Sequence, residues 1–340
     1  MSKVLVTGVT GQDGAFIAKK LISEGHQVFG TTRRGSSPKV DRLIEIDILG
    51  DIELISLEIS EFANVQSVLD EVRPDFVYNL AADSFVDDSH KHPQYTALVN
   101  YTGVLNILEA IRILKLDSRL FQASTSDMFG YVQSSPQSEE TPFNPINPYS
   151  ISKLAAHHMV KNYRETYGMH VVSGIMYNHE SELRGKQFVT RKISSWLAKI
   201  RAGYDKPIPL GNLDAARDWG YAPEFVDAMV AILEADEPRD FVIATNTITT
   251  VREFLRWCCE SVGFDVEFDG SGADETCIDR KSGRKIAVVD QKYFRTIDVQ
   301  VLQGDATRLR EAVGWTHRTS ARELANIMTT HDIEILNGRK

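Results

Sequence analysis

Three hydroxyl-bearing residues and one acid stand together at positions 124–127, within the stretch QASTSDMFG. We expect a strand to end here, because the run RLFQAST at 119–125 is rich in β-forming residues and gives way to polar ones. A carboxylate at the end of a strand often hydrogen-bonds the backbone of a turn. Taken alone, Asp127 is therefore best explained as a turn residue. A role in proton transfer requires partners elsewhere in the chain.

A tyrosine and a lysine one helical turn apart are candidates for such partners. Tyr149 and Lys153 lie four residues apart in a helix that we expect to open just after Pro148, so they share one helix face. A phenol titrates near pH ~10 in water, and a neighbouring ammonium lowers that pKa. Tyr149 can then exchange a proton with a substrate hydroxyl while hydride moves to a nicotinamide. YxxxK is frequent by chance, but here Thr125 ends a central strand and is placed to hydrogen-bond the same oxygen.

A glycine-rich turn follows the first expected strand, KVLVTG at 3–8. Glycines at a strand–turn–helix junction let the backbone approach a pyrophosphate at a helix N-terminus. The spacing is GxxGxxG, and a plain tight turn would not need three glycines at this step. We therefore predict a dinucleotide site, formed here by Gly8, Gly11, Gln12, Asp13 and Gly14.

The end of the second expected strand, HQVFGTT at 26–32, indicates which dinucleotide binds. An NAD-binding domain usually offers a carboxylate here to the adenosine ribose. The loop TTRRGSS at 31–37 has none, and its guanidiniums and hydroxyls suit a 2′-phosphate. A solvated basic loop is the alternative. We predict NADP rather than NAD, with Arg33 in contact with it.

Strand and helix patterns alternate through the first half of the chain. Further strands are expected at 52–58, 75–81 and 119–125, with helices at 14–24, 61–72, 93–114 and 150–167. The strands are nearly continuous apolar runs, as in a parallel sheet covered by helices on both faces. This pattern predicts an α/β fold with a doubly wound, Rossmann-like parallel sheet. After about residue 170 the alternation becomes irregular, which indicates a smaller mixed α/β lobe.

The composition narrows the possible partners. The 340 residues carry a formal net charge of −9, which argues against general nucleic-acid binding. No apolar run is long enough to span a bilayer, and the N-terminus lacks a signal-peptide pattern. Three cysteines fit a reducing cytoplasm without disulfides, so we expect a cytoplasmic protein. His90 and His92 lack a cluster of further ligands, so we expect no metal site.

These features resemble the extended short-chain dehydrogenase/reductase superfamily. A more specific resemblance, from residue 3 to roughly 336, is to the GDP-mannose 4,6-dehydratase family. Its motifs occur in the right order in both halves: TGVTGQDGAF, YNLAADSFV, QASTSDMFG, NPYSISK, NYRETYGMH, YNHESELRG, FVTRKI, LGNLDAARDWG and YFRTIDV. The resemblance implies an NADP-binding domain at 1–172 plus about 215–245. It implies a nucleotide-sugar-binding lobe at about 173–214 plus 246–340.

The resemblance also implies which residues bind the ligands and the subunits. Beyond the glycine turn, the cofactor contacts fall on Arg33, Ser36, Glu58, Leu80, Ala81, Tyr149 and Lys153. The GDP-sugar contacts fall on Asn178, Arg184, Val189, Lys192, Arg217, Arg295 and Asp298, with Asp83 and Ser84 near the sugar. Surface ion pairing is the alternative for any single arginine of this set. The segment around Arg33 and Ser36 resembles one that reaches a neighbouring subunit's cofactor, which implies a homodimer or homotetramer.

The family reaction oxidises sugar C4, eliminates water across C5 and C6, and returns the hydride to C6. The resemblance makes Thr125, Asp127, Tyr149 and Lys153 catalytic, with Asp127 as the C5 base. The family pattern has Glu at that position. Asp is shorter by one methylene, a shift of about 1 Å, and such a misplacement costs roughly 100-fold in rate.

Other departures also concern the ligand sites. Asp83 replaces a Gln, Glu58 an Asp and Asp298 a Glu; NYTGV at 100–104 replaces a DALGT-like run, and Ile146-Asn147 replaces an Arg-Ser pair. The substrate is accordingly GDP-mannose or a related GDP-hexose or heptose. One alternative is a GDP-4-keto-sugar reductase or C4 dehydrogenase, in which Asp127 is not a base. Another is a catalytically silent NADP-binding sensor, which would not need Thr125, Tyr149 and Lys153.

Overall fold

The chain folds into two compact units. A computed structural model describes residues 1–33, 39–293 and 301–338. Unit 1 comprises Met1–Tyr177, Pro223–Ile243 and Gly304–Thr316; unit 2 comprises Asn178–Ala222, Ala244–Gln303 and His317–Lys340.

These bounds differ from the expected ones by five residues or fewer at 173–177 and 244–245, and by more in two places. Residues 304–316, expected in the second lobe, belong to unit 1 because the backbone N–H of Asp305 donates to Gln137 at 2.8 Å and Leu309 is fully buried. Residues 215–222, expected in the first domain, belong to unit 2, where they contain a complete strand of a separate small sheet.

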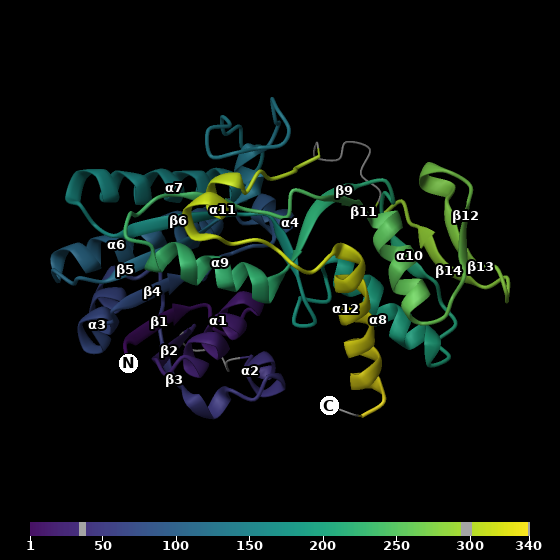
Figure 1. Ribbon diagram of the computed structural model, residues 1–340, viewed down its shortest axis with the longest axis horizontal. Coiled ribbons are helices and arrows are strands. Elements are labelled where there is room, and N and C mark those ends of the chain that lie inside the picture. Colours follow the sequence, from purple (N-terminus) through teal and green to yellow (C-terminus); the bar gives the residue numbers. More distant parts are fainter. Residues whose placement is uncertain (34–38, 294–300, 339–340) are drawn as a thin grey trace. The chain divides into compact units, whose positions relative to one another are not determined.

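Unit 1 is built on a seven-stranded sheet whose order is β10-β6-β5-β4-β1-β2-β3 (Figure 1). Every neighbouring pair is parallel, and the strand order reverses between β1 and β4. The strands are β1 (Lys3–Thr7), β2 (Gln27–Thr32), β3 (Ile52–Ser56), β4 (Phe76–Asn79), β5 (Arg119–Thr125), β6 (Val171–Met176) and β10 (Phe241–Ile243). Ligands of such sheets bind at the carboxyl ends of the strands beside this reversal.

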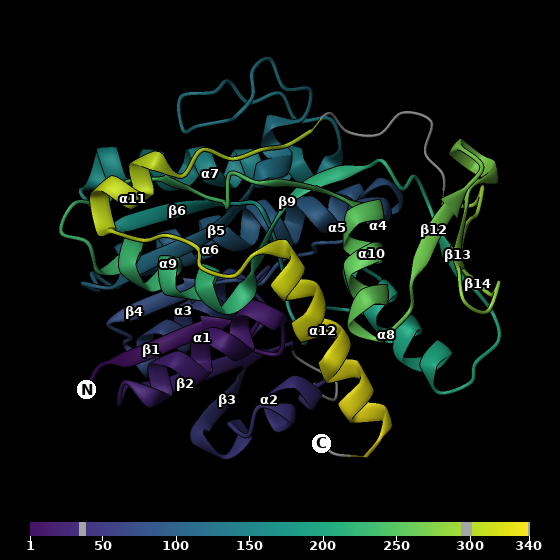
Figure 2. The same cartoon turned by 45° about the vertical axis from the view of Figure 1, so that its right-hand side comes forward.

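Helices cover both faces of the sheet, so the predicted doubly wound α/β fold is confirmed (Figure 2). On one face, α3 (Phe62–Val72), α6 (Gly103–Ile113) and α7 (Pro148–Tyr167) bury apolar side chains against the strands. On the other face lie α1 (Gln12–Ser23) and α9 (Ala222–Glu234). Shorter elements complete unit 1: α2 (Asp41–Glu45), η1 (Leu49–Asp51), α4 (Val86–Lys91), η3 (Ser126–Phe129) and α11 (Thr307–Val313).

One expected helix, 93–114, contains an irregular turn. It consists of α5 (Pro93–Ala97), a π-helical turn η2 (Leu98–Thr102) and then α6. A π turn inserts an extra residue into the helix and often marks a functional site. Here the turn contains Asn100, which is 1% exposed and hydrogen-bonds the segment after β4.

Where it is described, unit 2 has two small sheets and three long helices. Its strands are β7 (Asn178–Glu180), β8 (Ile208–Leu210), β9 (Ala216–Tyr221), β11 (Ile248–Thr250), β12 (Val266–Asp269), β13 (Thr276–Asp279) and β14 (Lys285–Val289). They form sheets of order β11-β9-β7 and β12-β13-β14-β8. The helices α8 (Val189–Arg201), α10 (Val251–Ser261) and α12 (Ala321–Leu336) share one apolar core with these sheets, and η4 (Gly272–Asp274) is a single turn.

The three cysteines are buried in the core of unit 2. Within the described ranges, no helix combines the length and the apolar character needed to cross a membrane.

Candidate active site

The glycine turn is shaped by close backbone contacts at the end of β1. Gly8 has φ +68°, and a Cβ built on it would lie 3.0 Å from the backbone nitrogen of Ala81. A Cβ on Gly14 would lie 2.3 Å from the Gly8 oxygen. The N–H of Gly11 donates to that oxygen at 2.9 Å, and α1 begins at the next residue. The turn is therefore a cradle that side chains would fill, and a dinucleotide pyrophosphate fits it.

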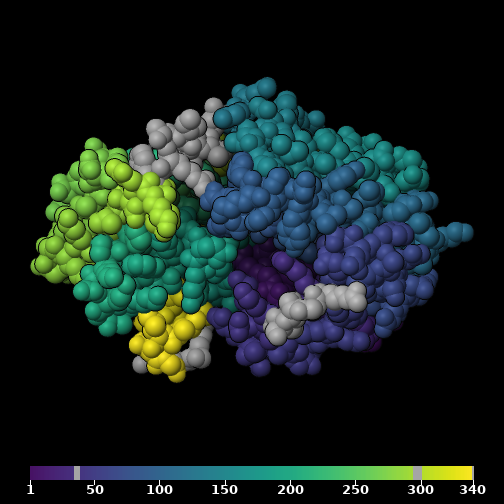
Figure 3. All heavy atoms as spheres, turned by 180° about the vertical axis from the view of Figure 1, so that it is seen from behind, coloured from purple at the N-terminus to yellow at the C-terminus, as the bar shows by residue number. Residues whose placement is uncertain are grey.

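Gln12 and Asp13, two predicted cofactor residues, lie in the first helical turn of α1. The Gln12 side chain is buried, and its amide nitrogen donates to the Asp13 carboxylate at 3.0 Å. In Figure 3, an early part of the chain, coloured dark purple, is visible beside later parts of unit 1 coloured indigo and blue.

The predicted contacts beyond β2 and β3 are only partly placed. Arg33 is exposed, and its Nη1 donates to the Tyr95 hydroxyl at 3.2 Å. Ser36 lies outside the described residues. The Glu58 carboxylate accepts from the Ser60 hydroxyl at 2.7 Å and thus stabilises its own turn after β3. The choice between NADP and NAD consequently remains a prediction.

The helix that carries the tyrosine and lysine begins with a well-defined cap. The Asn147 side chain accepts from the Ser150 N–H at 2.8 Å, and the Ser150 hydroxyl oxygen accepts from the Asn147 N–H. Pro148 is the first helical residue. This arrangement satisfies N–H groups that a helix start leaves unpaired. Tyr149 consequently lies in the first turn, with Lys153 one turn further along.

Lys153 is buried, and its pKa is perturbed. Its side chain is 4% exposed, and its ammonium donates to the Ala123 carbonyl of β5 at 2.7 Å. Burial lowers the pKa of Lys153 to about 8. A lysine whose pKa is lowered toward neutral pH, one helical turn from a tyrosine, is the arrangement that makes proton exchange by the tyrosine feasible.

Thr125 and Asp127 lie at the carboxyl end of the same strand. The Thr125 hydroxyl accepts from the Asp127 N–H at 3.2 Å, and Asp127 forms part of η3. Both residues are half-buried, whereas Ser124 before them and Ser126 between them are buried. The backbone of Asp127 is thus that of a turn residue, as its sequence context suggests.

The acid after β4 is held in place by the irregular helix. The Asp83 N–H donates to the Asn100 side chain at 2.8 Å, and Asn100 donates back to the Asp83 carbonyl at 3.0 Å. The Thr96 hydroxyl donates to the Asp83 carboxylate at 2.6 Å. Ser84 is exposed next to it. Asp83 therefore presents a carboxylate whose direction is fixed.

The residues expected to bind GDP are found in unit 2 as far as they are described. The Arg184 Nε lies 3.1 Å from the Glu180 carboxylate, and its guanidinium stacks on the Phe188 ring at 3.7 Å. Val189 opens α8, and Lys192 on the same helix lies 3.8 Å from the centre of the Tyr293 ring. Burial lowers the pKa of Lys192.

The other expected GDP contacts fall on β7, on β9 or beyond the described residues. Asn178 of β7 pairs in register with Trp219 of β9, and the Arg217 guanidinium donates to the Ala216 carbonyl at 2.7 Å. Arg295 and Asp298 lie outside the described residues.

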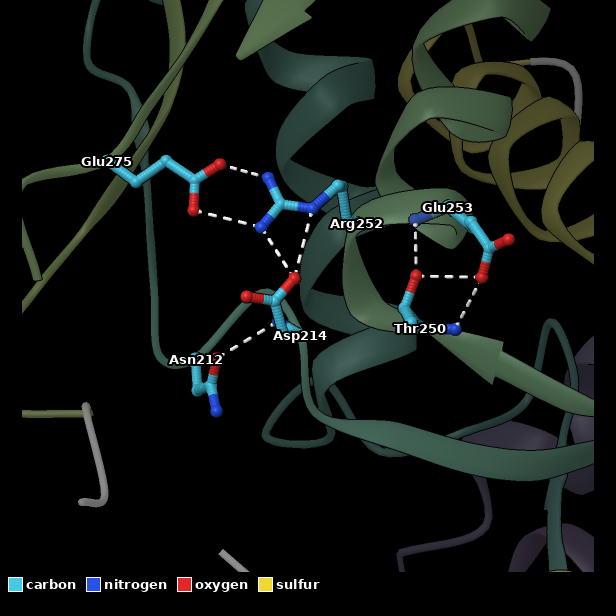
Figure 4. Close-up of polar contacts among 6 residues, drawn as sticks. All are labelled: Asn212, Asp214, Thr250, Arg252, Glu253 and Glu275. Carbon is cyan, nitrogen blue, oxygen red and sulfur yellow. Dashed lines mark hydrogen bonds and ion pairs between the residues drawn. The ribbon is translucent and has the colours of Figure 1, made fainter. Parts of the chain in front are cut away.

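The loop before Arg217 is fastened by an arginine that the sequence did not single out. Arg252 of α10 donates to Glu275 and, at 2.7 Å, to Asp214, whose N–H donates to Asn212 at 3.0 Å (Figure 4). Thr250 and Glu253 cap the same helix. Arg252 was not among the arginines expected to bind GDP; within that set, Arg184 forms an ion pair with Glu180.

Sequence reasoning also missed buried polar residues beneath the site. Thr7, Asn79 and Gln122 are each at most 1% exposed and hydrogen-bonded to one another. Arg42 of α2 donates to the Thr10 carbonyl within the glycine turn at 2.9 Å. The only local signal was a polar residue in each apolar strand, which marks a buried polar group without identifying its partner.

The sheet order, the glycine turn and the Tyr149–Lys153 helix define an extended short-chain dehydrogenase/reductase. The family described as GDP-mannose 4,6 dehydratase matches residues 5–328. More specifically, therefore, the chain belongs to the GDP-mannose 4,6-dehydratase family. A GDP-mannose 4,6-dehydratase of Sinorhizobium fredii is 44% identical over 343 residues, covering 99% of this chain and 98% of the relative. The predicted family is thereby confirmed.

Solved structures agree on the fold. A UDP-glucose 4-epimerase of Thermotoga maritima with UDP-glucose superposes with a TM-score of 0.83 at 23% identity, covering 98% of this chain and 99% of its own. RMD from Pseudomonas aeruginosa, complexed with NADPH, has a TM-score of 0.78 at 19% identity, covering 98% of this chain and 100% of its own. At these identities the likeness is one of fold.

Proposed function

We propose that this protein catalyses the NADP-dependent 4,6-dehydration of GDP-mannose, or of a closely related GDP-hexose or heptose. The product is a GDP-4-keto-6-deoxy sugar. The observation that carries the proposal is the buried Lys153 ammonium, which lies one helical turn from Tyr149 and is bonded to β5, the strand that ends at Thr125 just before Asp127. Membership of the family and its named relatives support the choice of substrate.

The chain's own residues divide the proton transfers between them. Tyr149 takes the proton of the C4 hydroxyl, and Thr125 hydrogen-bonds the same oxygen. The Lys153 ammonium favours the phenolate form of Tyr149. Asp127 removes the C5 proton, which the C4 ketone has made acidic, and passes it to the C6 hydroxyl, which departs as water. C5 takes up a proton again when C6 is reduced.

The glycine turn supports a nicotinamide dinucleotide as the cofactor. Gly8 and Gly14 lie where a Cβ would meet backbone atoms, and the absence of side chains lets a pyrophosphate approach the backbone. When bound, NADP supplies a hydride acceptor for C4 and a donor for C6, so the reaction involves no net redox change. Arg33, exposed directly after β2, supports the 2′-phosphate form, with Ser36 as its proposed partner. Gly11, Gln12, Asp13, Leu80 and Ala81 complete the proposed contacts, with Glu58 near the adenine.

Unit 2 is the proposed binder of the GDP moiety. Arg184, Lys192 and Arg217 offer the cations that a diphosphate needs in a chain of net charge −9. Asn178, Val189, Arg295 and Asp298 are the other proposed contacts. Asp83 and Ser84 face the sugar in this proposal, and we propose a homodimer or homotetramer.

Two observations favour a second candidate, a GDP-4-keto-sugar reductase or C4 dehydrogenase. The carboxylate at position 127 is one methylene shorter than the family's Glu, and Asp83 adds an acid held by Thr96. A reductase needs Tyr149 and Lys153 but no C5 base.

Incubation with GDP-mannose in the absence of added NADPH separates these candidates. The dehydratase converts the substrate to a product lighter by one water, measured by mass spectrometry, and Tyr149→Phe abolishes the conversion. A protein that leaves GDP-mannose unchanged, and consumes NADPH in proportion to an added GDP-4-keto sugar, would overturn the dehydratase proposal. Inertness in both reactions would point to the sensor alternative.

A further inference from the structure

A row of buried polar side chains crosses three strands of unit 1, at the last residues of β1 and β4 and in the middle of β5. Thr7 of β1 is the register partner of Asn79 of β4, and Asn79 is the register partner of Gln122 of β5. Register partners in a sheet point their side chains to the same face. All three are at most 1% exposed, so each polar atom needs a protein partner. We call these three residues the polar row.

The hydrogen bonds of the polar row run in one direction. The N–H groups of Leu80 and Ala81 both donate to the Thr7 hydroxyl oxygen at 3.1 Å. The single hydroxyl proton of Thr7 is then directed to the Asn79 carbonyl oxygen at 2.6 Å. That contact fixes the Asn79 amide, whose nitrogen donates to the Gln122 side-chain oxygen at 2.6 Å. Because the Gln122 side-chain oxygen faces Asn79, its side-chain nitrogen points away from Asn79.

The row ends at the carbonyl that holds the lysine. The Gln122 side-chain nitrogen donates to the Ala123 oxygen at 2.9 Å, and the Lys153 ammonium donates to the same oxygen at 2.7 Å. Two donors thus share one acceptor, so a change in one alters the acceptor available to the other. At its other end the row is bonded to the backbone of Leu80 and Ala81. A Cβ on Gly8 would lie only 3.0 Å from the Ala81 nitrogen, which is too close for an ordinary contact.

We propose that Gln122 is a positioning residue for Lys153. Its amide, oriented by Asn79 and Thr7, holds the Ala123 carbonyl in the direction that the ammonium needs. The catalytic consequence rests on the proposed function, because it assumes that Lys153 assists Tyr149. The physical coupling between Gln122 and Lys153 does not, and it can be measured without any substrate.

The first experiment is a double-mutant cycle in urea unfolding, with Gln122→Met and Lys153→Met singly and together. The two changes are expected to be non-additive, because both side chains act on the Ala123 oxygen. Gln137→Met is the matched control: Gln137 is 0% exposed and bonds Tyr177 and Ser134 instead. This control should be additive with Lys153→Met. Additivity of both pairs would overturn the coupling, whatever the protein's reaction is.

The second experiment tests the catalytic consequence in the reaction with GDP-mannose. Gln122→Met should lower kcat by roughly tenfold or more while KM changes little, because Lys153 acts on the chemical step. Gln137→Met should leave both constants near those of the wild type. A Gln122→Met enzyme with wild-type kcat would overturn the positioning role.

A second variant keeps the proposal testable if Gln122→Met does not fold. Gln122→Glu preserves the shape, but an ionised carboxylate cannot donate to the Ala123 carbonyl. Its kcat should therefore fall below that of the wild type at alkaline pH, and wild-type kcat there would overturn the proposal. Failure of the proposed function would be recognised separately, as a wild-type chain that forms no dehydrated product.

Discussion

Replacement of Lys153 by Met should change how the stability of the protein depends on pH. The pKa of Lys153 is about 8 in the folded chain, against 10.5 for an unperturbed lysine, because burial disfavours the ammonium. One pKa unit corresponds to about 1.4 kcal/mol, so the interval amounts to about 3 kcal/mol. Between these pH values the unfolded chain binds more protons than the folded one. The free energy of unfolding of the wild type should therefore rise with pH there, relative to Lys153→Met.

The destabilisation by the buried ammonium is thus complete below pH 8 and is relieved as the pH approaches 10.5. The assay is urea unfolding of both chains, followed by circular dichroism between pH ~7 and ~10. The free energy of unfolding of the wild type, relative to that of Lys153→Met, should rise by about 3 kcal/mol across that range. Lys161→Met is the control, since Lys161 lies on the same helix with an exposed side chain, and its difference from the wild type should stay flat. A flat difference for Lys153→Met would refute a pKa lowered by burial.

Two further outcomes follow from the structure. Arg33→Ala should weaken NADP binding about tenfold or more and leave NAD binding nearly unchanged, as measured by titration calorimetry, because Arg33 is proposed to bind the 2′-phosphate; tighter binding of NAD than NADP by the wild type would contradict the choice of cofactor. Burial lowers the pKa of His157 to about 4 from 6.5, so stability from this neutral histidine is present above pH 6.5 and is lost as the pH falls toward 4. In urea unfolding, His157→Gln should lose less stability than the wild type on acidification, by up to about 3 kcal/mol; equal losses would contradict this interpretation.

The parts of the fold that local patterns encode were predictable. The strand–helix alternation and the glycine turn specify the sheet, because each β–α unit carries its own periodicity and punctuation. The Tyr149–Lys153 pair was predictable for the same reason, since four residues in one helix fix a shared face.

The support beneath the site was not predictable from local patterns. Thr7 and Asn79 are 72 residues apart, and only the register of β1 with β4 brings them together. The capture of Asp83 by Thr96 and Asn100 depends on the π turn within an otherwise continuous helical pattern. The hydrogen bond from the Ser60 hydroxyl to the Glu58 carboxylate was not predicted either.

The most direct test of the central claim is the reaction of GDP-mannose in D₂O. The claim is that Asp127 removes the C5 hydrogen after transient oxidation at C4. The wild type should yield a dehydrated product with solvent deuterium at C5, located by NMR. Asp127→Asn should form that product roughly 100-fold more slowly or not at all, whereas Asp127→Glu retains a base. Wild-type rates from Asp127→Asn, or a dehydrated product without deuterium at C5, would contradict the account.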